Sequence, residues 1–460
     1  MKRLSDQINP DTRAAFAALY HLSWPVIMSR VGVMLMGLMD TIIVGRYSSV
    51  QLALLMLAQS VFWVPAVSGM GLLMGVQVKT SHFLGSGELE RIGAVFRRAI
   101  VYAGLLSLGF MALLLFGGDR FMSLAVSPAI ARDTHLPLIL FTVSMPGFLI
   151  SMACTQFLEA LGRTRDVLIS TLVANALNVA LLFALVPGHF SLFGVAFSGA
   201  MGAATATLIA RVGLAIGMLI YVVLMKETQD FGLLKKSVPD HDGAVEQRHI
   251  GYATGASYFI EVAAFAGMTL FAGRVDEAAV ACWGIILNFS AIVFMVPLGI
   301  SAGCSVLVGK AYGAKDKAGL ARTGRVSFLS AGAFCSLVVL SVLTAAPLIA
   351  HGYTSDASLF PIVRHGLILA CLYFIPDGLQ VVAAQALRAR KDILAPTMIH
   401  YVSYGAIMLP LGFLFCLTFS WGVDGLIGAV VAASAISGTF QTGRFLWLDK
   451  RSTGAAVLSK

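Results

Sequence analysis

Apolar runs of about 20 residues recur along the whole chain and alternate with short breaks rich in charged residues, Pro and Gly. A helix of about 20 apolar residues crosses roughly 30 Å of hydrocarbon with its backbone hydrogen bonds satisfied internally. The ten-residue alternating segments typical of membrane β-barrels do not occur. We therefore predict an all-α integral membrane protein with twelve transmembrane helices. The predicted spans cover residues 17–45, 50–78, 97–117, 136–160, 167–187, 192–224, 250–273, 279–309, 326–350, 362–387, 395–417 and 422–447.

The composition also favours lipid as the solvent. Of the 460 residues, 58% are hydrophobic and only 12% are charged, which leaves few charged side chains to cover a water-soluble fold. The first span contains Arg30 and Asp40 and reaches Val44, so it is too long and too polar for a cleaved signal peptide. The six cysteines lie in apolar stretches without CxxC spacing, which indicates core packing rather than a zinc site or disulfides.

The basic residues are distributed unevenly between the two sides of the predicted bundle. If both termini are cytoplasmic, only five of the 32 Lys and Arg residues face outward, and two, Arg30 and Arg211, lie deep within spans. Basic residues are retained on the cytoplasmic side, so this bias predicts a multi-pass protein of the bacterial inner membrane with both termini inside. The bias also explains the net charge of +9 without a nucleic-acid partner. The five outer residues are Arg46, Arg120, Arg132, Arg274 and Arg364.

The two halves of the chain resemble each other at an offset near 228 residues. A Val-Pro pair at residues 64–65 corresponds to one at 296–297 if a four-residue gap is allowed. The Ala-Leu pair at residues 160–161 and the one at 386–387 end the fourth and tenth spans in the same way. An internal repeat of this length indicates a duplicated structural unit.

Because six spans form each repeat, the second half enters the membrane from the same side as the first. We predict an N-terminal six-helix half at residues 1–225, a cytoplasmic linker at 226–249 and a C-terminal six-helix half at 250–460. Parallel repeats of this kind surround a central cavity, and rocking of the halves opens that cavity alternately to each side.

Two acids lie deep inside predicted spans of the C-terminal half. Glu261 is near the middle of the seventh span, and Asp377 is deep in the tenth. Tyr373 precedes Asp377 by four residues, so both side chains project from one helix face. An ionisable group in hydrocarbon costs several kcal/mol and is functional by default. These three residues are candidates for a site that binds Na⁺ or a proton.

Other intramembrane polar groups leave more alternatives open. The acids either bind a cation or only satisfy polar neighbours, including Arg30. Arg30 forms an ion pair or contacts substrate, and Asp40 faces a cavity or lies close to the outer interface. Asn178 and Asn288 either bond to other helices or contact substrate.

These positions resemble a known family, the multidrug and toxic compound extrusion (MATE) exporters, and within it the NorM-like bacterial branch. The first span carries Met-Gly-Leu-Met-Asp-Thr at residues 36–41, the eighth carries Pro-Leu-Gly at 297–299, and the tenth carries Tyr-x-x-x-Asp at 373–377. Glu261 falls where that branch has its helix-seven glutamate. The resemblance covers essentially the whole chain.

The resemblance implies residue roles. Glu261, Tyr373 and Asp377 would form the cation-coupling site, and Asp40 would belong to the cavity of the N-terminal half and to proton coupling. Arg30 departs from the pattern, because an uncharged polar residue is expected there; a fixed positive charge would favour protons over Na⁺. The expected function is secondary active antiport, which exports cationic drugs or toxic metabolites from a monomer in exchange for H⁺ or Na⁺ and needs no other cofactor.

Two further functions are weighed against antiport. A lipid-linked or polysaccharide precursor flippase of the same superfamily would carry more basic residues along its cavity. A membrane-embedded enzyme would need a nucleophile and base; the Gly-x-Ser-x-Gly sequence at residues 299–303 lies inside an apolar span, where small residues allow close helix packing. No P-loop and no zinc-ligand spacing of histidines occur, so we expect neither ATP hydrolysis nor other enzyme activity.

Overall fold

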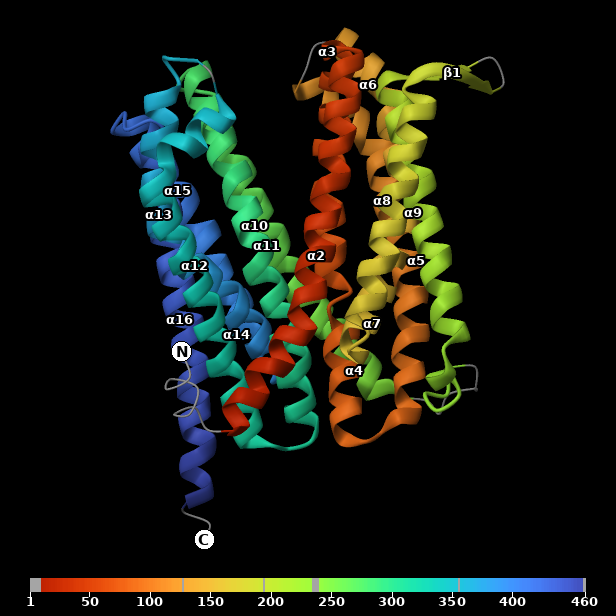
Figure 1. Ribbon diagram of the computed structural model, residues 1–460, viewed down its shortest axis with the longest axis vertical. Helices are drawn as coiled ribbons and strands as arrows, with labels where there is room; N and C mark the ends of the chain where they lie inside the picture. The colour runs from red at the N-terminus through yellow and green to blue at the C-terminus, as the bar shows by residue number, and fades with distance from the viewer. Residues whose placement is uncertain (1–9, 126–127, 193–194, 234–239, 355, 458–460) are drawn as a thin grey trace. The chain divides into compact units, whose positions relative to one another are not determined.

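The computed structural model describes residues 10–125, 128–192, 195–233, 240–354 and 356–457, and most of them are helical (Figure 1). Within these ranges, twelve helical segments are long and apolar enough to cross a membrane. The predicted all-α fold with twelve spans is therefore confirmed. No span has to expose backbone polar groups to lipid, because helices satisfy them internally.

The helices that precede the middle of the chain are α2 (Pro10–Tyr47), α3 (Ser49–Leu72), α4 (Gly75–Ser86), α5 (Ile92–Ala125), α6 (Pro128–Val143), α7 (Met145–Leu161), α8 (Thr164–Leu185) and α9 (Gly199–Leu224). Those that follow are α10 (His241–Ala272), α11 (Glu277–Gly313), α12 (Lys317–Tyr353), α13 (Phe360–Ala389), α14 (Leu394–His400), α15 (Leu409–Phe413) and α16 (Val423–Val457). Short 3-10 turns, η1 (Leu89–Arg91) and η2 (Lys226–Thr228), and π-helical segments, η3 (Tyr401–Met408) and η4 (Leu414–Thr418), complete the helical elements.

The chain divides into two compact units. The N-terminal unit is Met28–Gly255, and the C-terminal unit holds the described residues of Met1–Ile27 and Ala256–Lys460. Helices α2 and α10 therefore contribute to both units, which differs from the predicted halves. The first turns of α2 join the C-terminal unit because they pack on small residues of α11: a Cβ on Gly303 would lie 2.4 Å from Ser23 Oγ. The Gly-x-Ser-x-Gly sequence thus serves helix packing.

The predicted linker at residues 226–249 is partly helical. It contains η2 and the beginning of α10, while residues 234–239 lie outside the described ranges. Helix α10 begins at His241 because the side chain of Asp240 accepts a hydrogen bond of 3.1 Å from the backbone N–H of Gly243. An aspartate in this position satisfies one of the free N–H groups of the first helical turn.

The sixth span begins later than the sequence predicts. Residues from 192 onward were expected to be helical, but α9 begins only at Gly199, after an antiparallel hairpin of β1 (Pro187–Leu192) and β2 (Val195–Ser198). The prediction included part of this hairpin in the sixth span because its residues are apolar. Its aromatic and β-branched residues favour strands instead. Gly199 adopts a φ of +50°, a conformation that glycine tolerates and that separates strand from helix.

One largely buried helix lies at the centre of each unit. Helix α7 packs against α3, α4, α5, α8 and α9 in the N-terminal unit, and α13 packs against α11, α12 and α16 in the C-terminal unit. The two helices occupy equivalent positions in the sequence repeat. Each central helix can therefore present polar side chains that several neighbouring helices reach.

Two glycines of α16 provide a test of this packing. A Cβ on Gly438 would lie 2.6 Å from the carbonyl oxygen of Pro376 in α13, whereas a Cβ on Gly443 would meet no atom within 4 Å. Gly438→Ala should destabilise the protein by about 1–3 kcal/mol through overpacking. Gly443→Ala, the matched control, should be neutral or slightly stabilising because alanine favours helix. Thermal unfolding of both variants in detergent measures the difference; equal midpoints would contradict this account of α13 and α16.

Candidate functional site

A polar cluster surrounds Asp377 on the central helix α13 of the C-terminal unit. Its Oδ1 atom accepts hydrogen bonds from the Tyr404 hydroxyl at 3.3 Å, from Ser434 Oγ at 3.4 Å and from Gln380 Nε2 at 3.5 Å. Tyr404 and Ser434 are fully buried, so these donors replace water inside an apolar unit. All three bonds are long, and therefore the carboxylate is oriented without being tightly held.

Glu261 on α10 is the second acid of this cluster. It interacts electrostatically with the carboxylate of Asp377 and with the guanidinium of Arg388. Within the described ranges Glu261 makes no hydrogen bond or ion pair. Two carboxylates within interaction distance in an apolar unit repel each other strongly, so they favour a proton or another cation between them. The structure thus brings together the two acids that the sequence singled out.

Tyr373 has a different partner from the one its spacing suggests. Its hydroxyl shares a hydrogen bond of 2.5 Å with Ser290 Oγ on α11, while the phenol that donates to Asp377 is Tyr404 in η3. The sequence did not indicate Tyr404, because no spacing relates it to Asp377. Tyr373 is therefore hydrogen-bonded to α11, and it interacts with Asp377 only electrostatically.

Further polar side chains follow Asp377 along α13. Gln380 Oε1 lies 2.8 Å from His400 Nε2, and Gln385 Nε2 donates to the Tyr258 hydroxyl at 2.9 Å. One turn further, the guanidinium of Arg388 donates to Ser257 Oγ at 2.9 Å and is 1% exposed. The contacts satisfy these buried groups only in part, since Gln385 Oε1, Arg388 Nε and His400 Nδ1 have no partner among the described residues. These polar side chains lie along α13 between the acid pair and the end of the central helix.

Asp40 is buried in the N-terminal unit and is not at an exposed interface, with 2% of its surface accessible. Its Oδ2 atom accepts a hydrogen bond of 3.3 Å from Thr207 on α9, and Asn178 Nδ2 donates to the same hydroxyl at 3.4 Å. The other oxygen, Oδ1, has no donor among the described residues. A buried carboxylate with one unsatisfied oxygen is a natural place for a proton.

Arg211 compensates the charge of Asp40. The two groups interact electrostatically, and Arg211 donates to Ser144 Oγ at 2.9 Å. Its guanidinium carbon lies 4.4 Å from the ring centre of Phe62 and 5.3 Å from that of Phe148. Aromatic faces attract a desolvated guanidinium. The sequence analysis recognised Arg211 only as an intramembrane charge, because nothing in the sequence shows which rings surround it.

Arg30 forms an ion pair, but with an acid that the sequence analysis missed. Its guanidinium lies 3.1 Å from Glu159 Oε1 on α7, and Gln77 Nε2 donates to Glu159 Oε2 at 3.1 Å. Glu159 and Gln77 are almost completely buried. Glu159 was missed because it lies at the predicted end of the fourth span, where a charge is unremarkable.

The remaining candidates are weaker. Asn288 Oδ1 accepts a hydrogen bond of 3.0 Å from the hydroxyl of Tyr353, an exposed contact between α11 and α12. No group of three or more His, Cys, Asp or Glu side chains suitable for a metal ion occurs in the part of the chain that the structure describes. The oxygen donors around Glu261 and Asp377 are carboxylates and hydroxyls, which suit a hard monovalent cation or a proton.

The arrangement of spans and intramembrane acids agrees with a comparison to protein families. The family model described as MatE matches residues 25–184 and again residues 253–414. The chain belongs to the MatE family. The predicted resemblance to MATE transporters is thereby confirmed. The two matches begin 228 residues apart, which is the offset at which the two halves of the sequence align.

Several relatives extend over almost the whole length of this MATE transporter. It is 41% identical over 439 residues to a probable multidrug resistance protein NorM of Caulobacter vibrioides, covering 95% of this chain and 93% of that protein. It is 28% identical over 444 residues to a multidrug resistance protein NorM of Aliivibrio fischeri, with 95% of each chain covered. Among solved structures, the eukaryotic MATE transporter AtDTX14 superposes with a TM-score of 0.85 at 17% identity, covering 95% of this chain and 96% of that chain. This structural likeness supports the shared fold.

The sequence repeat allows a test of the Arg30 ion pair. Position 258 lies 228 residues after Arg30, and the Tyr258–Gln385 hydrogen bond links α10 to α13 as Arg30–Glu159 links α2 to α7. Arg30→Tyr alone leaves Glu159 buried without its cation and should cost about 3–5 kcal/mol of stability. Adding Glu159→Gln recreates the neutral pair and should restore most of the loss in thermal unfolding. If the double variant is as unstable as the sum of both single changes, the two contacts are not equivalent.

Proposed function

We propose that this MATE-family chain is a secondary active antiporter of the bacterial inner membrane, which exports small organic cations, drugs or toxic metabolites in exchange for H⁺ or Na⁺. Its relatives named as multidrug resistance proteins support a small-molecule substrate. Twelve membrane-length helices in the described ranges support a multi-pass location. The excess of basic residues in one set of connections supports cytoplasmic termini. Among the described residues, the salt bridges that involve buried side chains all lie within this one chain, which supports action as a monomer.

The observation that carries the proposal is the Glu261–Asp377 pair. Both acids interact within one apolar unit, and the only guanidinium that interacts with Glu261 among the described residues is that of Arg388. With both carboxylates ionised, these three groups sum to one negative charge. Binding one proton or one monovalent cation removes this charge and the repulsion between the carboxylates. We therefore propose that one coupling cation binds in each transport cycle.

The cation and the substrate would be coupled through their effects on conformation. A ligand shifts an equilibrium between two conformations only by the difference in its affinity for them. If the conformation that holds a cation at Glu261 and Asp377 binds substrate weakly, entry of the cation promotes release of the substrate. Linkage is reciprocal, so substrate bound from the cytoplasm would weaken cation binding by the same factor.

The fixed charge of Arg388 favours a proton as the coupling ion. A sodium ion would have to occupy a position between the carboxylates with a guanidinium nearby, whereas a proton binds directly to one carboxylate oxygen. Tyr404 and Ser434 both donate to Asp377 Oδ1, which leaves Asp377 Oδ2 and the two oxygens of Glu261 to take the proton. Asp40 in the N-terminal unit is a second proton-binding candidate, since its Oδ1 atom lacks a donor among the described residues. Arg30 does not influence this choice, because Glu159 neutralises it.

Neutral replacements of the two acids test this function. Glu261→Gln and Asp377→Asn should each abolish gradient-driven export of a fluorescent organic cation, because the site can no longer bind the coupling cation. Asp424→Asn is the matched control: Asp424 lies in the same unit, is exposed and contacts only the exposed His365 at 3.2 Å among the residues described. Purified variants in liposomes, given either a pH gradient or a Na⁺ gradient, provide the measurement. Full transport by the Glu261→Gln/Asp377→Asn double variant would refute the proposed coupling site, and the response to each gradient identifies the ion.

A further inference from the structure

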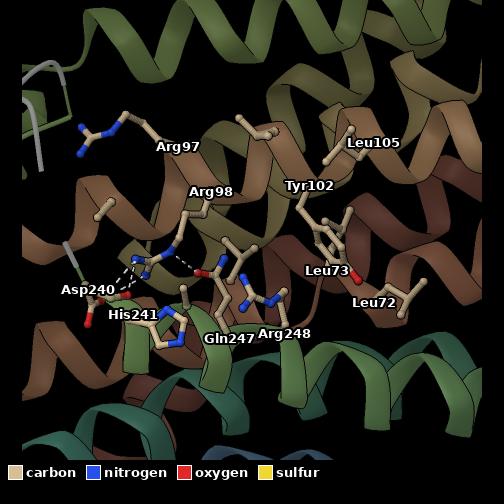
Figure 2. A pocket seen from close by; sticks show the side chains of 14 residues that line it. Leu72, Leu73, Arg97, Arg98, Tyr102, Leu105, Asp240, His241, Gln247 and Arg248 are labelled. Atoms are coloured by element: carbon tan, nitrogen blue, oxygen red, sulfur yellow. Dashed lines mark hydrogen bonds and ion pairs between the residues drawn. The ribbon is translucent and has the colours of Figure 1, made fainter.

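A cavity of about 760 Å³ lies within the N-terminal unit (Figure 2). Its walls come from the junction of α3 and α4, from the first turns of α5, and from the beginning of α10. These elements end or begin at the connections that carry the excess of basic residues. The cavity therefore lies at one edge of the apolar spans, where a membrane protein meets lipid headgroups.

One end of the cavity is apolar. Leu72, Val101 and Leu105 line it, and the last two are 64% and 63% exposed on the outward side of α5. In a membrane-spanning helix such exposed apolar side chains face acyl chains. The apolar wall thus continues from the cavity onto the surface that lipid covers.

The other end is cationic. Arg98 on α5 lies 3.3 Å from Asp240 Oδ2 and donates to Gln247 at 3.1 Å, as Figure 2 shows. Asp240 is shared, because its Oδ1 atom lies 2.7 Å from the guanidinium of Arg91. Although partial burial opposes it, hydrogen bonds from Arg91 and from the Gly243 N–H lower the pKa of Asp240, which is therefore ionised at neutral pH. The single carboxylate of Asp240 therefore pairs with two guanidinium groups, those of Arg91 and Arg98.

Arg248 adds a positive charge that no described side chain pairs with. It is exposed on α10, and among the described residues it makes no hydrogen bond or ion pair. It interacts electrostatically with Arg98 and with Tyr102, and in Figure 2 it extends into the space between the two helices. Two guanidinium groups that repel each other form a place where an anion is stabilised. Arg97 does not take part, since it donates to the carbonyl oxygen of Gly232 at 2.7 Å.

We propose that this cavity binds an anionic glycerophospholipid of the cytoplasmic leaflet. Its phosphate would lie between Arg98 and Arg248, and an acyl chain would follow Leu72 and Leu105. Arginine pairs recognise phosphate oxygens through several parallel hydrogen bonds. A soluble phosphate ester would leave the apolar wall without a partner, whereas a lipid covers both ends. The bound lipid would join the first turns of α5 and α10.

Lipid titrations of the purified protein in a neutral detergent test the proposal. Dioleoylphosphatidylglycerol should raise the unfolding midpoint more than dioleoylphosphatidylcholine at equal concentration, and native mass spectrometry should detect its adduct. Arg248→Gln should weaken phosphatidylglycerol binding about tenfold, the size expected for one hydrogen-bonded charge. Since Arg248 is exposed and has no protein partner in the described ranges, this variant should fold normally. Arg248→Lys should recover part of the affinity.

Arg165→Gln is the matched control, because Arg165 is an exposed arginine of the same unit that does not line the cavity. It should bind phosphatidylglycerol like the unmodified protein. The proposal is overturned if both lipids stabilise equally, or if Arg165→Gln weakens binding as much as Arg248→Gln. An equal response to inorganic phosphate or glycerol phosphate would also overturn it, since the site would then take a soluble anion.

Discussion

Removing an ionised side chain from water costs several kcal/mol, and this cost governs where the chain keeps charges inside its spans. In the N-terminal unit each buried charge has a local partner: Arg30 pairs with Glu159, and Arg211 interacts with Asp40, Ser144 and aromatic rings. These pairs sum to zero charge. In the C-terminal unit, Glu261 interacts with a second acid, Asp377, as well as with Arg388. The buried charges of the N-terminal unit therefore cancel. In the C-terminal unit, Glu261, Asp377 and Arg388 together carry one negative charge, which one bound cation would neutralise.

The internal repeat clarifies how this asymmetry is built. The Arg30–Glu159 contact joins the first helix of its unit to the central helix α7, and the neutral Tyr258–Gln385 contact joins α10 to α13 at the equivalent place. A shared scaffold position thus holds a fixed ion pair in one unit and an uncharged pair in the other. Glu261 lies one turn beyond Tyr258, towards the middle of the span, where the N-terminal unit has Val33 at the equivalent position. The helix-to-helix contact is therefore common to both units, and Glu261 is an acid beside it that only the C-terminal unit has.

The features that depend on local composition, namely the spans and the acids deep within them, could be predicted from the sequence. Apolar runs gave the twelve spans, and depth within a span singled out Asp40, Glu261 and Asp377. Sequence reasoning could not find Tyr404 or the role of Arg211, because their contacts depend on how distant helices are rotated about their axes. Glu159 was missed for a related reason: its burial follows from the depth of α7 within its unit, while its place in the sequence looks like the end of a span. The hairpin of β1 and β2 was missed because its residues are as apolar as a helix.

Helix α10 connects several of these features within its own length. Its start is fixed by Asp240, which caps the helix and binds Arg91 and Arg98 of the neighbouring α5 region. Its later turns carry Tyr258 and Glu261, which contact or interact with the polar side chains of α13. Tyr258 and Glu261 lie one turn apart, so a single stretch of α10 carries both the neutral contact to Gln385 and the acid that interacts with Asp377. The polar groups of the C-terminal unit are therefore concentrated where α10 and the central helix α13 face each other.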